Sequence, residues 1–186
     1  MAKLLPDPAP LHAFGASVGI SGDYSVVGDP GDGTMGSNAG AAYIFRQSGL
    51  HWERQAKIFG SDTGFQDTFG YSVGIDADRI VVGAPYYDPT GSDKGFAYVF
   101  QRAGDTWVQQ QKLISSGSAL DDEFGWSASI SGDVIVVGAP GQPFGVGRAY
   151  VFRWNGTQWA EEQVLSLVHP PPAYSAGPSM RMPIES

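Results

Sequence analysis

The sequence predicts an all-β fold built from three copies of one unit. A Phe-Gly pair recurs every 55 residues, and a Val-Val-Gly run recurs at the same spacing further along each copy. An Ala-Tyr-aliphatic-Phe run and a tryptophan follow in every copy, with the last interval shortened to 52 residues. Repeats of this length are supersecondary units that bury their faces against their neighbours. The three copies open at Phe14, Phe69 and Phe124.

The composition is that of a folded chain with many short strands. Hydrophobic residues make up 42% of the 186 residues, and the 26 glycines and 13 prolines indicate frequent tight turns. The net charge of −8 should repel phosphate backbones and anionic lipid, so neither nucleic acid nor a membrane is expected as a partner. With no cysteine, the chain has neither disulfides nor thiolate metal sites.

The middle copy shows four strand patterns in succession. Residues 69–75 alternate small or polar with apolar side chains, as a half-buried strand does. After a short turn, residues 80–84 form a β-branched run typical of a strand that is buried on both faces, and Pro85 ends it. Residues 95–101 and 107–114 then predict a third and a fourth strand.

Four consecutive antiparallel strands in each copy are the layout of a β-propeller blade. The sequence therefore predicts a β-propeller segment of three four-stranded antiparallel blades, an incomplete ring within one chain. The blades are expected at about residues 14–60, 69–115 and 124–168, with an extra strand and linker at 1–13 and a proline-rich tail at 169–186. The innermost strand of a blade crowds the axis. Small residues in the first strand of each copy fit that position: Ser17, Gly19, Ser72, Gly74, Ser127 and Ser129.

Three blades are too few to close a ring. Propellers close with about four to eight blades, so an isolated segment would leave two apolar blade faces in water. We expect a homo-oligomer, most simply a dimer that completes a six-bladed ring, or docking of other propeller blades. The strand expected around residues 3–5 would edge a blade of another copy or end a blade lying upstream.

The repeated motifs resemble the FG-GAP repeats of integrin α-type β-propellers and of related bacterial extracellular proteins. The resemblance covers roughly residues 3–168, and two copies contain both motifs in order. The first copy departs from the pattern with Gly-Asp-Pro in place of Gly-Ala-Pro. A kelch propeller is the nearest rival, but the paired glycine usual after its second strand is not found. The motifs are Phe69-Gly70 with Gly83-Ala84-Pro85, and Phe124-Gly125 with Gly138-Ala139-Pro140.

The resemblance implies a non-enzymatic binding or assembly module of the integrin-like FG-GAP propeller type, which mediates protein–protein interaction. It also implies an extracellular or cell-surface location. The first six residues lack the apolar stretch of a signal peptide.

Calcium is not expected as a cofactor. Many integrin-type blades bind calcium in a loop of alternating acidic residues between the Phe-Gly strand and the Gly-Ala-Pro strand. In this chain those connections are tight turns with one or two carboxylates, whereas calcium requires six to eight oxygen ligands. Asp76 with Asp78 is the one pair that leaves calcium open as an alternative. No metal or other cofactor is predicted.

The loops between the second and third strands are the expected ligand loops, because propellers present binding sites at one end of the ring. They mix aromatic rings with carboxylates, a combination suited to a sugar or a peptide. Ordinary solvated turns are the competing interpretation. A carbohydrate-binding extracellular lectin is therefore an alternative function, with a protein or a glycan as ligand. The candidate residues are Tyr86, Tyr87, Asp88, Asp93, Asp32 and Phe144.

A hydrolase is the second alternative, because paired carboxylates could act as general acid and base. The linkers between blades contain the acidic residues that would be needed. However, two of them occupy equivalent positions two residues before Phe-Gly, and a carboxylate repeated in each copy favours a turn or capping role. The three histidines lie at unrelated positions, so no cluster with metal-ligand spacing exists. No catalytic residue is predicted. The linker acids are Asp62, Asp67, Asp121, Asp122 and Glu123.

Overall fold

Twelve β-strands form three separate four-stranded antiparallel sheets, one for each copy of the repeat. The computed structural model describes residues 13–86, 94–117, 122–141 and 147–167, and these contain no helix. The strands are β1 (Ser17–Ser21), β2 (Tyr24–Asp29), β3 (Ala41–Ser48), β4 (His51–Ile58), β5 (Ser72–Asp76), β6 (Arg79–Ala84), β7 (Phe96–Ala103), β8 (Thr106–Leu113), β9 (Ser127–Ser131), β10 (Val134–Ala139), β11 (Arg148–Trp154) and β12 (Trp159–Ser166).

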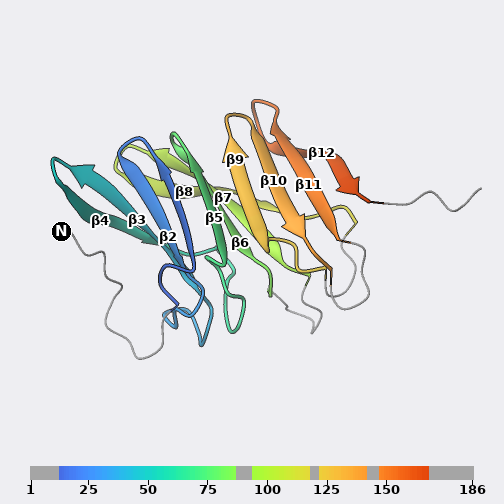
Figure 1. Ribbon diagram of the computed structural model, residues 1–186, viewed down its shortest axis with the longest axis horizontal. Helices are drawn as coiled ribbons and strands as arrows, with labels where there is room; N and C mark the ends of the chain where they lie inside the picture. The colour runs from blue at the N-terminus through green and yellow to red at the C-terminus, as the bar shows by residue number, and fades with distance from the viewer. Residues whose placement is uncertain (1–12, 87–93, 118–121, 142–146, 168–186) are drawn as a thin grey trace, which may run out of the picture.

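Each sheet is a simple meander, with the four strands hydrogen-bonded in chain order. The three sheets stand side by side in the order of the sequence (Figure 1). The first strands β1, β5 and β9 pack against one another, so they form the inner edge of the row. A Cβ added at Gly19 in β1 would lie 3.1 Å from Ile75 in β5, which explains why small residues are needed at this edge. The prediction of an incomplete propeller of three blades is confirmed.

The Phe-Gly pairs precede the first strands, so the prediction that the strand starts at residue 69 is wrong. Gly15, Gly70 and Gly125 adopt positive φ angles of 94°, 89° and 101°, a conformation that favours glycine. The Gly70 amide still donates to the carbonyl of Gly83 at 3.0 Å, and Gly125 repeats this bond. The pair is therefore a turn that leads into the strand, and its alternating pattern extended the predicted strand backwards.

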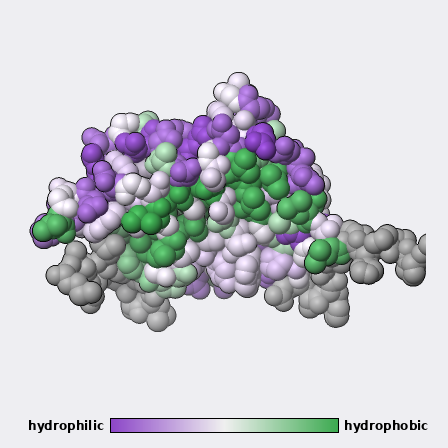
Figure 2. All heavy atoms as spheres, turned by 45° about the horizontal axis from the view of Figure 1, so that its top comes forward, coloured by the Kyte–Doolittle hydropathy of each residue, from purple (hydrophilic) through white to green (hydrophobic). Residues whose placement is uncertain are grey.

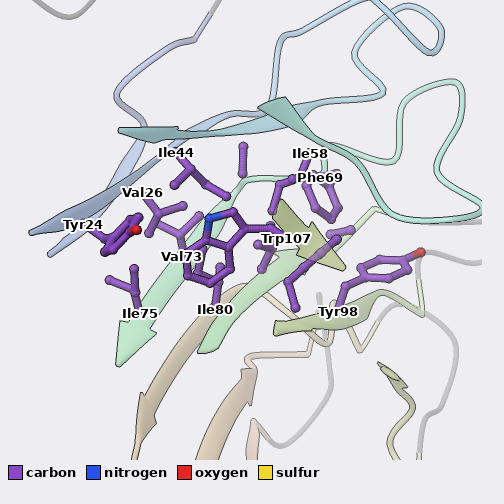
Figure 3. Close-up of a cluster of buried hydrophobic side chains, with 14 residues drawn as sticks. Tyr24, Val26, Ile44, Ile58, Phe69, Val73, Ile75, Ile80, Tyr98 and Trp107 are labelled. Atoms are coloured by element: carbon purple, nitrogen blue, oxygen red, sulfur yellow. The ribbon is translucent and has the colours of Figure 1, made fainter. Parts of the chain in front are cut away.

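Two hydrophobic cores lie between the sheets. The first and second blades enclose one of them, in which Val26 and Ile44 face Phe69, Val73 and Trp107 (Figure 3). The second and third blades enclose the other, built from the same positions one repeat later. The blades are thus held together by apolar faces that stack side by side, as in a propeller.

Some predicted segments lie outside the described residues. These are the extra strand near residues 3–5 and the proline-rich tail 169–186. In the part of the chain that the structure describes, no helix is long and apolar enough to cross a membrane.

Candidate functional site

The outer face of the third blade exposes residues whose counterparts in the second blade are buried. Val136 is 37% exposed, whereas Val81 at the same position of the second blade is 0% exposed. Leu165 is 44% exposed, whereas its counterpart Leu113 is 1% exposed. The side chains between them are only half-buried. The third-blade end face consists of Val136, Ala149, Val151 and Leu165.

A groove of about 550 Å³ runs along this end face. Its lining includes Ser127, Gly138 and Ala149, together with Leu165 from the last strand. The same positions of the second blade contact the Phe-Gly turn of the third blade, and the groove therefore lies where a further Phe-Gly turn would pack.

The first blade presents the opposite kind of face. Val18 and Ile20 are 69% and 68% exposed, while their counterparts Val73 and Ile75 in the second blade are 8% and 9% exposed. These residues of the second blade pack on the first blade, but in the first blade they face solvent. The first-blade end face consists of Phe14, Val18, Ile20 and Trp52.

The aromatic packing behind the first-blade end face is already formed. Phe14 meets Tyr43 edge to face with ring centroids 5.3 Å apart, and Phe45 at 6.2 Å. Phe69 packs on its own blade in the same way, at 5.5 and 6.0 Å from the equivalent rings. The third hydrophobic cluster is thus one half of an inter-blade core, contributed by a single sheet.

Serine and glycine fix the Phe-Gly turn of each following blade. The Ser17 hydroxyl donates to the carbonyl of Gly70 at 2.9 Å, and Ser72 donates to Gly125 at 2.8 Å. A Cβ added at Gly28 would lie 2.0 Å from the Gly70 carbonyl oxygen, too close for any side chain. The blades therefore approach each other through bare backbone at this point.

Two further polar contacts span each junction. Near the outer edge, the Trp107 indole donates to Gln55 at 3.2 Å, and Trp159 donates to Gln110 at 3.0 Å. At the inner edge, the turn after the first strand accepts a backbone N–H from the next blade, for example at the Ser21 hydroxyl from Ala77 at 3.0 Å. These contacts recur at equivalent positions, so both junctions are built alike.

On the face drawn in Figure 2, hydrophobic residues form a band bordered by hydrophilic ones. This view looks onto the side of the row of blades, so the band lies between the two end faces.

Of the predicted ligand-loop residues, Tyr86 lies in a half-buried aromatic cluster. Its ring centroid is 5.9 Å from that of Tyr71 and 6.2 Å from that of Trp126, and the latter two are 4.8 Å apart. Sequence reasoning missed Tyr71 and Trp126, although both directly follow a Phe-Gly pair. The other candidates of these loops, Tyr87, Asp88, Asp93 and Phe144, lie outside the described residues.

Asp32, the remaining candidate, is fully buried and bonded within its own blade. Its carboxylate accepts hydrogen bonds from the Thr34 amide and the Tyr43 hydroxyl at 2.9 Å, and it pairs with Lys57 at 2.8 Å. Burial raises the pKa of this carboxyl, but these partners outweigh burial and hold the pKa at about 2. The carboxylate therefore anchors its own loop.

The second blade repeats this arrangement with a carboxylate from a different loop. Asp62 accepts a hydrogen bond from the Tyr98 hydroxyl at 2.8 Å and pairs with Lys112 at 2.6 Å. Asp67, buried in the same linker, accepts from the Gly64 amide within its turn. These two linker acids therefore have structural partners of their own.

The acidic residues on the other loops do not gather. Asp122 and Glu123 are both buried in the second linker, and Asp121 lies outside the described residues. Asp76 accepts from the Gly132 amide at 2.6 Å, while Asp78 accepts from the Gln101 side chain. Among the residues that the structure describes, no group of three or more histidines and acids could hold a metal ion.

Comparison with known proteins agrees with this architecture. The FG-GAP repeat family matches the chain three times in succession, at residues 1–45, 52–100 and 107–152. No curated protein matches the chain. Three consecutive matches and three equivalent four-stranded blades show that the chain belongs to the FG-GAP repeat family.

Proposed function

We propose that this chain is a non-enzymatic assembly module that binds further propeller blades through its two end faces. The family supports this class of function, since FG-GAP repeats suggest a propeller-type protein-interaction module and are generally non-enzymatic. The observation that carries the proposal is the contrast between equivalent positions. Val81 and Leu113 are buried by a neighbouring blade, whereas Val136 and Leu165 are not.

The exposed apolar side chains at the ends would contribute to docking. The exposed parts of Val18, Ile20, Val136 and Leu165 together equal about two fully exposed aliphatic side chains. Burying a whole aliphatic side chain contributes about 1.5–3 kcal/mol. One junction therefore gains roughly 3–6 kcal/mol from these four residues, before the aromatic rings are counted.

Thiol labelling tests the proposal cleanly, because the chain has no cysteine of its own. Single variants Val18→Cys and Val136→Cys place a thiol on each end face. Val108→Cys, at a residue 54% exposed in β8 and outside both end faces, is the matched control. In an extract of the cells that make the protein, the end-face thiols should react much more slowly than the control. All three should react alike after denaturation.

Rapid labelling at positions 18 and 136 in that extract would contradict the proposal. Both end faces would then be bare in the presence of every partner that the cell provides.

A second candidate function is carbohydrate binding at the cluster of Tyr71, Tyr86 and Trp126. Three half-buried rings in mutual contact offer faces on which the C–H groups of a sugar can stack. A glycan array followed by titration of Trp fluorescence tests it. Saturable binding that is lost in Trp126→Ala but kept in Phe65→Ala, an exposed phenylalanine elsewhere, would favour a lectin.

A further inference from the structure

We propose that the blade received by the third-blade end face is the first blade of a second copy of this chain. Two such head-to-tail junctions, related by a two-fold axis, would close a six-bladed ring. This inference rests on the proposed function and names the partner.

The two end faces are the two halves of one interface, which the chain itself contains twice. The residues of the third-blade end face are the counterparts of the second-blade residues that pack against the third blade. The residues of the first-blade end face are the counterparts of the second-blade residues that pack against the first blade. Each copy therefore has both halves of the interface. Within the chain, the face equivalent to one half packs against the face equivalent to the other.

Glycines on both end faces have the space that a docked blade would fill. A Cβ added at Gly70 or Gly125 would lie 2.3 Å from a carbonyl oxygen of the preceding blade, whereas Gly15 has nothing within 4 Å. On the other face, a Cβ at Gly83 would lie 2.0 Å from the Gly125 carbonyl oxygen. At Gly138 it would meet only Ser127 of its own blade, with the hydroxyl at 2.3 Å and the backbone oxygen at 3.8 Å.

Gly138 is informative because its backbone does not need glycine. Its φ angle lies outside the left-handed region, and Ser127 can rotate away from a methyl group. The fold of one copy therefore tolerates alanine at this position. A docked Phe-Gly turn does not, since it would bring the Gly15 carbonyl against the new methyl group.

The polar contacts of the internal junctions also have counterparts on the two end faces. Ser127 corresponds to Ser17 and Ser72, and its hydroxyl would donate to the Gly15 carbonyl. At the outer edge, Glu162 takes the place of Gln110 and would accept from the Trp52 indole. A carboxylate accepts such a bond at least as well as an amide does.

One position makes this junction looser than the internal ones. A Cβ added at Gly74 would lie 3.3 Å from the backbone of Ser129 and Ile130 in the next blade. The third blade already has such a Cβ, because Ser129 occupies the position of Gly74. The incoming β1 would have to yield by a few tenths of an ångström, so Ser129→Gly should tighten the association.

A closed pair is favoured over an open chain of copies. Association costs translational and rotational freedom once for each copy added. When two copies close a ring, one loss of translational and rotational freedom is offset by two junctions. When a copy is added to an open chain, the same loss is offset by one junction. Two copies give six blades, within the range of about four to eight in which propellers close.

The first test is the mass of the purified 186-residue chain, measured by sedimentation or light scattering. We expect twice 19.7 kDa for the unaltered protein. Gly138→Ala should yield a folded 19.7 kDa monomer with unchanged circular dichroism. Gly64→Ala is the matched control, because Gly64 has nothing within 4 Å and no positive φ, and it should remain a pair. Ser129→Gly should lower the dissociation constant several-fold.

A disulfide test covers the case in which Gly138→Ala fails to fold. Within the chain, Gly74 and Ile130 are the counterparts of Ser129 and Ile20. A Cβ at Gly74 would lie 3.3 Å from the backbone nitrogen of Ile130, so Ser129 and the docked Ile20 would be close enough for a disulfide. Ser129→Cys mixed with Ile20→Cys should give one cross-linked species under mild oxidation. Neither variant should give that species alone.

Each contrary result is distinct. A purified monomer whose positions 18 and 136 are nevertheless protected in the extract would overturn the second copy as partner and keep the proposed function. Assemblies that grow with concentration would overturn the closed pair. A pair that survives Gly138→Ala, or that gives no mixed disulfide, would overturn the head-to-tail junction.

Discussion

Leu113→Ala should lower the free energy of unfolding by about 3–4 kcal/mol. Replacing a buried leucine with alanine costs about 2–5 kcal/mol, and more when the cavity cannot collapse. Leu113 is 1% exposed and belongs to the core between the second and third blades, so both sheets would have to move to fill the gap. For a chain of this length, that loss should lower Tm by about 6–16 °C.

Leu165→Ala is the matched control, because it makes the same change at the equivalent position of the third blade. That side chain is already 44% exposed and borders an open groove, so little cavity forms. The expected loss is about 1–2 kcal/mol in the monomer. If copies associate, the loss should rise toward that of Leu113→Ala as the protein concentration increases.

Urea denaturation followed by tryptophan fluorescence measures both losses, at concentrations well below and well above the association midpoint. Equal losses for the two variants in dilute solution would refute the assignment of Leu113 to an inter-blade core. A loss for Leu165→Ala that does not change with concentration would argue against docking at this face.

Three further changes probe the contacts inside the chain. Gly83→Ala should prevent stable folding, seen as lost thermal cooperativity, because the new Cβ would lie 2.0 Å from the Gly125 carbonyl oxygen; a cooperative transition would contradict this geometry. Asp32→Asn should remove on the order of 2 kcal/mol of the stability measured at neutral pH. Because the folded pKa of about 2 lies below the ordinary value of 3.8, this stability is full above pH 4 and disappears as the pH falls toward 2. If both proteins lost stability in parallel during an acid titration, this reasoning would be disproved. Arg79→Lys should cost about 1 kcal/mol in thermal unfolding, since the guanidinium lies 5.3 Å from two tryptophan rings of the third blade and a lysine stacks less well; no change would exclude that stacking.

Local sequence patterns were sufficient to predict the blades. The alternation in the first strand and the β-branched run 80–84 depend on the two-residue period of a strand, which does not require knowledge of distant residues. The strand ends were less well predicted. The Phe-Gly turn continues the alternating pattern, and only its positive φ separates it from the strand. A register shift between the third and fourth strands, at Ile44/Phe45 and its equivalents, has no signal in a single sequence.

The contacts of the candidate site could not be predicted from local patterns. Ser17 and Gly70 are 53 residues apart, and they meet only when two blades stack. The burial of Asp32 was missed for the same reason, because its partner Lys57 comes from the far strand of the blade. A usable signal was present in the repeat itself. A serine two residues after every Phe-Gly glycine suggests a contact made once in each junction, but the local pattern does not show that the serine reaches the next blade.

The sequence alone determined three copies, four strands in each, and too few blades for a ring. Only the tertiary structure decided which surface of each strand is covered. The strands β6 and β10 both contain Ile-Val-Val-Gly-Ala, yet Val81 is buried and Val136 is not. The difference arises because burial is provided by the neighbouring sheet, and the described chain places a sheet beyond β6 but none beyond β10.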